Sequence, residues 1–176
     1  YVLDLARGVI GGANWLAAVD SLATLYERDG RIRDALVTRR AIVQRYPFLP
    51  QSWSGLAALE LNRSGGDPER MPYIAGLFEQ ALERDPAHVP ALGVLGALAL
   101  QSGDRATAIA MLERARDAAP NTPQVLYNLS GAYMMDGRAP EALALAEQLV
   151  QLQPGNPDYQ ALLQGLRTEA SGGAPR

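Results

Sequence analysis

The sequence predicts an all-α protein built as an array of stacked helical hairpins, and two observations indicate this fold class. Pro86, Pro120 and Pro154 fall 34 residues apart, and each closes a segment with the same pattern of small and large apolar residues. Glycines such as Gly103 and Gly137 stand inside these segments, where the left-handed backbone that glycine tolerates ends a helix. A unit of this length cannot bury its own apolar face and must stack on copies of itself. We therefore expect a right-handed helical-hairpin solenoid of about four repeats plus a C-terminal capping helix.

The N-terminal part of the chain carries the less regular copies of the pattern. Residues 1–13 are expected to be an N-terminal extension or the end of a preceding helix. The first repeat, residues 14–47, is marked by Leu22, Ala23, Tyr26, Gly30, Ala35 and Pro47. The second repeat, residues 48–86, is marked by Trp53, Leu56, Ala57, Glu60, Phe78, Ala81 and Pro86. Between its two helices, residues 63–72 lengthen the turn, a surface insertion that adds little closure entropy.

The third and fourth repeats, residues 87–120 and 121–154, show the unit most clearly. The first helix of the third repeat carries apolar or small residues at i, i+3, i+4 and i+7, the spacing that buries one helix face. These positions are Leu92, Leu95, Gly96 and Ala99, and their counterparts in the fourth repeat are Leu126, Leu129, Ser130 and Tyr133. The second helices carry Ala108, Leu112 and Ala115, then Ala142, Ala146 and Leu149. We expect Gly96 to lie at a close helix contact, where a larger residue would hold the paired helix away.

The end of the chain is expected to cover the last apolar face of the stack. Residues 156–167 form an amphipathic pattern with an inner side made of Tyr159, Leu162, Leu163 and Leu166. Stacked arrays need such a capping helix. Residues 168–176 are rich in small residues and are expected to be a flexible tail.

The spacing Trp/Leu-x2-Leu-Gly-x2-Tyr, followed by Gly, Ala, a bulky residue, Ala and Pro, resembles the tetratricopeptide repeat. The resemblance covers roughly residues 14–154 and is clearest in the third and fourth repeats. The first repeat departs from it at Arg39, where the family has a bulky apolar residue. The resemblance implies a protein-binding scaffold that holds a peptide or partner protein on the concave surface formed by the first helices.

Composition limits the other function classes. The net charge of −3 argues against strong nonspecific binding of nucleic acid, and the absence of cysteine excludes disulfides, thiolate metal sites and cysteine catalysis. No apolar run reaches the roughly 18 residues of a membrane span. All 16 basic residues are arginine, which suggests a GC-rich, bacterial source. The chain begins at Tyr1, so we expect it to be trimmed from something longer. The compartment, bacterial cytoplasm or periplasm, stays open.

Catalytic chemistry is not expected. His88, the single histidine, lies in a turn between two repeats at the entrance to a helix, where we expect a solvated loop residue rather than a general base. The Gly11-Gly12 and Gly65-Gly66 pairs lack the Gly-Lys-Ser/Thr of a phosphate-binding loop. We therefore expect no enzyme activity, no cofactor and no metal site.

The candidate binding residues are the inner positions on the first helix of each repeat, which the resemblance places on the concave surface. They are Ala17, Asp20, Thr24, Gln51, Ser54, Ala58, Pro90, Gly93, Ala97, Gln101, Gln124, Tyr127, Asn128, Gly131 and Met134. Tyr127 and Met134 are large apolar groups on a face that stacking does not need. Family members that clamp a terminal carboxylate use basic residues and Asn, and here Asn128 alone matches. We expect instead an extended or helical partner segment with apolar anchors.

An arginine cluster is the second candidate surface. It consists of Arg28, Arg31, Arg33, Arg39, Arg40 and Arg45. We interpret it as a solvated outer helix face with intrahelical pairs, the alternative being a docking patch for an acidic partner. Because the expected inner face carries almost no arginine, recognition of single-stranded RNA is not expected.

The sequence therefore predicts a protein–protein interaction scaffold or adaptor, acting in assembly of a bacterial complex. Two alternatives stay open. The chain could be the substrate-recruiting module of a larger enzyme, such as a transferase or hydroxylase, whose catalytic domain lies elsewhere. It could also be a self-assembling homo-oligomer that stacks through its ends.

Overall fold

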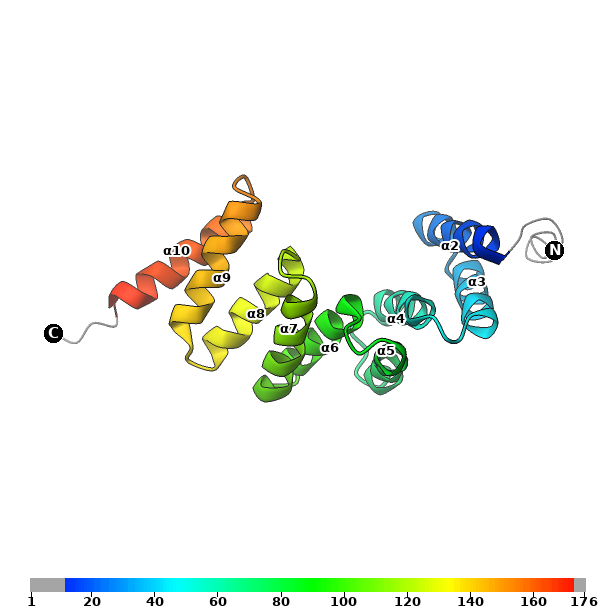
Figure 1. The fold of residues 1–176 in the computed structure, drawn as a ribbon, viewed down its shortest axis with the longest axis horizontal. Coiled ribbons are helices and arrows are strands. Elements are labelled where there is room, and N and C mark those ends of the chain that lie inside the picture. Colours follow the sequence, from blue (N-terminus) through cyan, green and yellow to red (C-terminus); the bar gives the residue numbers. More distant parts are fainter. Residues whose placement is uncertain (1–11, 173–176) are drawn as a thin grey trace. The chain divides into compact units, whose positions relative to one another are not determined.

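The computed structural model describes residues 12–172, and these residues form α-helices joined by short turns, with no strand among them (Figure 1). The helices are α2 (Gly12–Arg28), α3 (Ile32–Arg45), α4 (Pro50–Ser64), α5 (Met71–Arg84), α6 (Val89–Gln101), α7 (Arg105–Ala118), α8 (Pro123–Met135), α9 (Ala139–Leu152) and α10 (Pro157–Gly172). The expected all-α hairpin architecture is thus confirmed. Residues 1–11, which hold most of the expected N-terminal extension, lie outside the described part.

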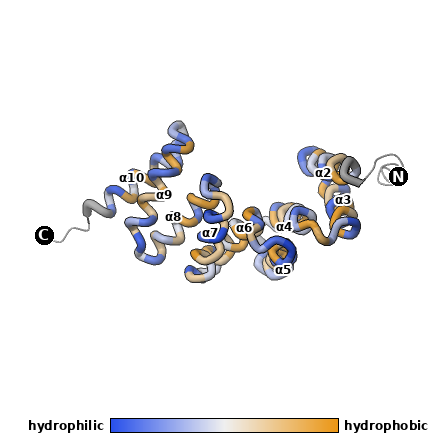
Figure 2. Tube along the Cα trace, viewed as in Figure 1, coloured by the Kyte–Doolittle hydropathy of each residue, from blue (hydrophilic) through white to orange (hydrophobic). Residues whose placement is uncertain are grey.

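The chain divides into two compact units, which we describe separately. Unit 1 ends at Pro86 and contains the hairpins α2–α3 and α4–α5, with α3 packed on α4. Unit 2 begins at Ala87 and contains the hairpins α6–α7 and α8–α9, with α7 and α6 both contacting α8, and with α10 packed on α9. Figure 2 shows hydrophobic and hydrophilic residues alternating along the hairpin helices, the pattern of helices that are apolar on one side.

Proline and glycine set the ends of the helices. Several helices carry proline in their first turn, where its missing N–H group is not needed and its fixed φ angle suits a helix. Gly103 and Gly137, which lie between the two helices of each unit 2 hairpin, have φ angles of 81° and 77°. Residues with a Cβ atom rarely adopt this left-handed backbone, so these glycines make the sharp reversal possible.

The core of unit 2 follows the repeat pattern closely. Leu92 and Leu112 in the first hairpin and their counterparts Leu126 and Ala146 in the second are all fully buried. A Cβ atom built on Gly96 would lie 2.6 Å from the Cγ atom of Leu112, closer than real Cβ contacts come. The expected close contact at Gly96 is therefore confirmed, and it lets α6 and α7 approach each other.

In unit 1 a buried carboxylate joins three segments. The side chain of Glu60 in α4 is 1% exposed, and its oxygens accept hydrogen bonds from Arg63 at 2.7 Å, Arg70 at 2.6 Å and Arg40 at 3.3 Å. Arg40 comes from α3, and Arg70 stands at the N-cap position of α5. Burial acts to raise the pKa of Glu60, but the hydrogen bond from Arg63 and the charges of the three arginines outweigh it and hold the pKa below its usual value.

A tyrosine occupies the equivalent place in unit 2. Tyr133 in α8 is 3% exposed, and its hydroxyl donates to Glu113 of α7 at 2.6 Å. The guanidinium of Arg138, at the start of α9, lies 4.0 Å from the centre of the Tyr133 ring. Burial and the neighbouring Glu113 carboxylate raise the pKa of Tyr133, so the hydroxyl stays protonated and can donate.

The end of the chain differs from the sequence expectation in one respect. The capping helix was expected over residues 156–167 and a flexible tail from residue 168, but α10 continues through Gly172. Thr168 and Glu169 do not break a helix, and the Thr168 hydroxyl donates to the carbonyl of Gly165 within the same turn. Residues 173–176 of the expected tail lie outside the described part.

Candidate functional site

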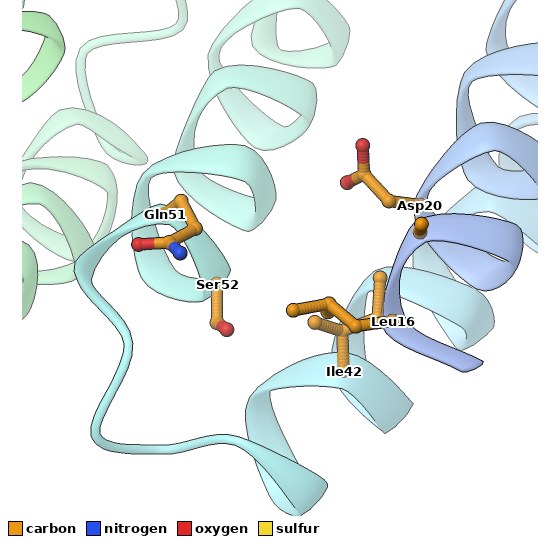
Figure 3. Close-up of a pocket in the computed structure, with 6 residues that line it drawn as sticks. Leu16, Asp20, Ile42, Gln51 and Ser52 are labelled. Carbon is orange, nitrogen blue, oxygen red and sulfur yellow. The ribbon is translucent and has the colours of Figure 1, made fainter. Parts of the chain in front are cut away.

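In unit 1 a cleft of about 260 Å³ opens between three helices (Figure 3). Its lining consists of Leu16, Ala17 and Asp20 from α2, Ile42 from α3, and Gln51 and Ser52 from α4. The structure thus brings together three of the expected inner-face positions, Ala17, Asp20 and Gln51. The apolar walls lie beside three polar side chains, those of Asp20, Gln51 and Ser52, so the cleft can hold an apolar group that carries hydrogen-bonding atoms.

The helix periodicity explains why these residues share the cleft. Trp15, Val19 and Ala23 of α2 are buried in the hairpin, which turns the neighbouring Ala17 and Asp20 toward α4 and solvent. Thr24 follows one turn after Asp20, and its hydroxyl donates to the Asp20 carbonyl at 3.1 Å. Thr24 is exposed, as its expected place on the inner face requires.

Arg39 brings one positive charge to this face. Its side chain is only 12% exposed, and its guanidinium forms an ion pair with Asp20, contacts the Thr24 hydroxyl at 3.3 Å and pairs with Glu27 at 3.0 Å. The long stem of Arg39 takes the place of a bulky apolar residue and carries the charge from α3 across to α2. One arginine, Arg39, thus reaches the inner positions of unit 1, where its charge is paired with Asp20 and Glu27.

The arginine cluster is also not one solvated surface. Arg31 forms the expected intrahelical pair with Asp34 at 2.8 Å. Arg39 and Arg40, however, pair with residues of α2 and α4, and the Arg45 guanidinium lies 5.2 Å from the centre of the Trp15 ring. These arginines tie helices together, so the interpretation as an outer face with intrahelical pairs holds only in part.

Along α4 the expected inner positions differ in exposure. Gln51 and Ala58 are exposed, whereas Ser54 is 8% exposed and its hydroxyl donates to the Gln51 carbonyl at 3.4 Å. Ser54 is therefore a packing residue and offers little surface to a partner. Ser52, which sequence reasoning did not select, lines the cleft instead.

In unit 2 the most prominent inner-face feature is a pair of aromatic rings. Tyr127 of α8 is 41% exposed, and its ring centre lies 6.0 Å from that of Tyr159 in α10. Beside it the Gln124 amide donates to the Asn128 side chain at 3.1 Å. We expected Tyr159 on the buried side of the capping helix. Tyr159 lies 34 residues after Val125, an α8 residue beside the inner face. The repeat period was therefore the signal that could have placed Tyr159 beside this face.

The remaining expected positions of unit 2 differ in packing and exposure. A Cβ atom on Gly93 would meet the Val125 side chain at 3.5 Å, so Gly93 lies where α6 and α8 pack together. A Cβ atom on Gly131 would meet nothing within 4 Å, so Gly131 leaves open space on α8. Pro90 and Gln101 are exposed, whereas Ala97 and Met134 are half-buried.

Residues 12–172 contain no group of three or more His, Asp or Glu side chains that could hold a metal ion. His88 stands at the start of α6, as expected, and its carbonyl accepts the Leu92 N–H group at 3.1 Å. None of the helices in the described part is long and apolar enough to span a bilayer.

The sequence matches the family model described as Tetratricopeptide repeat over residues 75–126 and again over residues 99–166. Cellulose synthase operon protein C of Pseudomonas fluorescens (strain SBW25) is 32% identical over 145 residues, which cover 80% of this chain. The chain spans only 11% of the length of that relative.

Solved structures agree on the fold. A thermophilic tetratricopeptide repeat protein of Thermus thermophilus matches with a TM-score of 0.67 and 23% identity over 87% of this chain and 81% of that one. The pilF protein of Pseudomonas aeruginosa gives a TM-score of 0.73 at 18% identity, over 98% of this chain and 72% of that one. MamA of Desulfovibrio magneticus RS-1 gives a TM-score of 0.70 at 21% identity, over 89% of this chain and 85% of that one. At these identities the likeness concerns the fold alone.

Proposed function

We propose that this chain, which belongs to the tetratricopeptide repeat family, is the repeat portion of a scaffold protein that binds a partner polypeptide on the inner faces of its first helices. The single observation that carries the proposal is the exposed Tyr127 ring beside Tyr159. The two rings lie on the first helix of a hairpin and on the capping helix, so stacking of the second helices does not cover them.

The chemistry of this face suits an apolar anchor of the partner. Exposed tyrosine supplies a large contact area at a small cost in side-chain entropy, and such residues dominate many protein interfaces. Gln124 stands one turn before Tyr127 and Asn128 follows it directly, and their paired amides can both donate to and accept from a peptide backbone. Gly131 leaves room for the partner chain to come close to α8.

The match to cellulose synthase operon protein C supports a more specific setting. That relative shares 32% identity with most of this chain, and its name links it to a cellulose synthase operon. We infer that the full-length protein containing this chain serves a similar polysaccharide-producing system, in which the repeats hold another protein of the complex.

Site-specific photo-crosslinking tests the proposal in the source cells. Tyr127 is replaced by the photoreactive residue p-benzoylphenylalanine in the full-length protein, and crosslinked polypeptides are identified by mass spectrometry. Tyr73 of α5 is the matched control, because it is a tyrosine of similar exposure, 49%, on the second helix of a hairpin. We expect a discrete crosslinked polypeptide from position 127 and none from position 73.

Two results would contradict the proposal. Crosslinks from position 73 without crosslinks from position 127 would place the partner on the second helices. Crosslinks from position 127 solely to a second copy of the same protein would favour the self-assembling oligomer over an adaptor for another protein.

A further inference from the structure

We propose that the cleft of unit 1 is a subsite for one neutral, branched apolar side chain of an extended peptide, and that Ser52 recognises the adjoining peptide group. The proposal rests on the proposed function, since it assumes a polypeptide partner, and it assigns chemistry to a second place on the chain. Its basis is the juxtaposition of an apolar cleft with a buried hydroxyl that has no partner.

The Ser52 hydroxyl is the unusual group. Ser52 is 3% exposed, and its oxygen forms no hydrogen bond in the structure. Most serines of the described helices, Ser54 among them, donate to a carbonyl of their own helix. Burying a hydroxyl without a partner is unfavourable, so such a group in a native protein calls for an explanation.

The direction of the Ser52 hydroxyl supplies an explanation. Figure 3 shows the Ser52 oxygen pointing from α4 toward Leu16 and Ile42, into the cleft. Leu16 is half-buried in the same lining, and the proposal requires its flexible side chain to turn so that a ligand reaches the hydroxyl. A serine hydroxyl can both donate and accept, as both a peptide N–H and a peptide carbonyl require.

The walls of the cleft set the class of side chain. Leu16, Ala17 and Ile42 give an apolar lining, and the volume of about 260 Å³ suits one aliphatic side chain together with its peptide group. Gln51 stands at the rim, where its amide can bond the next backbone group.

The charges at the rim indicate a neutral occupant. Asp20 is the charged residue of the lining, and it already pairs with the buried guanidinium of Arg39. A cationic ligand would compete with Arg39, and an anionic ligand would face the Asp20 carboxylate. A neutral, leucine-like side chain neither competes with Arg39 nor brings a negative charge to Asp20, so we assign the cleft to that class of side chain.

The test uses the full chain and two small probes, N-acetyl-leucine methylamide and N-acetyl-glycine methylamide. Each carries two peptide groups, and the leucine probe alone has the apolar side chain. Binding is followed by NMR through the signals of Ala17, Ile42 and Ser52. We expect the leucine probe to shift these signals in a saturable way and the glycine probe to shift them at least several-fold more weakly.

Three variants locate the binding. Ala17→Phe fills the exposed wall of the cleft and should abolish the shifts without unfolding the chain. Ser52→Ala removes the hydroxyl and should weaken the leucine probe about fivefold, the equivalent of one hydrogen bond. The same variant should raise the melting temperature, because it relieves the unpartnered group. Ser54→Ala, the matched control on the same helix, loses a bonded hydroxyl and should leave probe affinity unchanged without raising the melting temperature.

The proposal is overturned if both probes bind equally, if the leucine probe shifts none of these signals, or if binding persists in Ala17→Phe. An unchanged affinity in Ser52→Ala would also refute the assigned role of Ser52. These outcomes are separate from the crosslinking at position 127. If the probes do not bind but position 127 still crosslinks a partner, only the proposal of this subsite is refuted. If the leucine probe binds but position 127 gives no crosslink, the subsite stands and the scaffold function proposed for unit 2 is refuted.

Discussion

Gly96 of α6 has Leu112 of α7 packed directly over its Cα atom, so that a Cβ atom there would collide with Leu112 at 2.6 Å. Leu112 is itself fully buried and cannot easily move away. Gly76 of α5 is a helical glycine in the opposite situation, because a Cβ atom there would meet nothing within 4 Å. The two glycines therefore separate the effect of close packing from that of backbone entropy.

We predict that Gly96→Ala lowers the free energy of unfolding by about 1–3 kcal/mol, because the added methyl group overpacks the α6–α7 contact. Gly76→Ala should raise the free energy of unfolding by about 0.5–1 kcal/mol, because alanine favours the helix and meets open space. Urea denaturation of both variants measures this. A similar sign of change in both would mean that α6 and α7 do not meet closely at Gly96.

Glu60 gives a prediction that depends on pH. Its pKa is lowered in the folded state, so the carboxylate stabilises the fold above its unfolded pKa of about 4.3, and this contribution is lost as the pH falls through the folded pKa. Glu60→Gln should lower the free energy of unfolding at pH 7 by about 3 kcal/mol or more, since three arginines lose their buried anion.

Urea denaturation of wild type and Glu60→Gln from pH 7 to pH 3 checks this prediction. The gap between the two proteins should stay constant down to about pH 4.5 and narrow below it, in line with the lowered pKa of Glu60. A gap that is already absent at pH 7 would show that the buried carboxylate contributes no net stability.

At the scale of the helical element, an arginine at the start of the second helix repeatedly packs on an aromatic residue of the first. The Arg31 guanidinium lies 4.3 Å from the centre of the Tyr26 ring, and that of Arg138 lies 4.0 Å from Tyr133. Both arginines are N-cap residues without a side-chain cap bond, so their place owes more to the ring contact than to capping. This contact fixes the turn between the two helices of a hairpin.

We predict that Tyr133→Phe lowers the free energy of unfolding by about 1–3 kcal/mol, because it removes the hydroxyl that donates to the Glu113 carboxylate between α7 and α8. Tyr26→Phe keeps the comparable stacking of the ring on Arg31 and should lower the free energy of unfolding by less. Thermal and urea unfolding of the two variants compare them directly. Equal costs would show that the Glu113 hydrogen bond adds nothing to the packing between hairpins.

The sequence predicted the elements better than the contacts that cross between them. The 34-residue period located Gly96 and its buried neighbours, because small and large residues at fixed spacing report a packed helix face. It could not show that Arg39 reaches α2, because the path of a long side chain depends on neighbouring helices. It also missed Ser52, whose place in the cleft depends on how α2, α3 and α4 pack together. The contact of Tyr159 with Tyr127 was missed as well, although the 34-residue spacing from Val125 offered a signal for it.

At the scale of the whole chain, the division after Pro86 separates two sets of hairpins, each with its own buried core. We predict that residues 87–176 expressed alone fold into a helical unit that unfolds cooperatively, because α6 to α10 pack on one another within this segment. Circular dichroism during heating measures this. A fragment that is mostly unfolded at low temperature would show that unit 2 depends on the preceding repeats.

We propose that the exposed Tyr127 on α8, the first helix of the second hairpin of unit 2, binds a partner polypeptide. The most direct measurement is calorimetric titration of the polypeptide crosslinked at position 127 into wild type, Tyr127→Ala and Tyr73→Ala. We predict that Tyr127→Ala weakens binding by about 1–3 kcal/mol, roughly 5- to 150-fold, while Tyr73→Ala binds like wild type. Wild-type affinity in Tyr127→Ala together with a loss in Tyr73→Ala would contradict the claim and place the partner on the second helices.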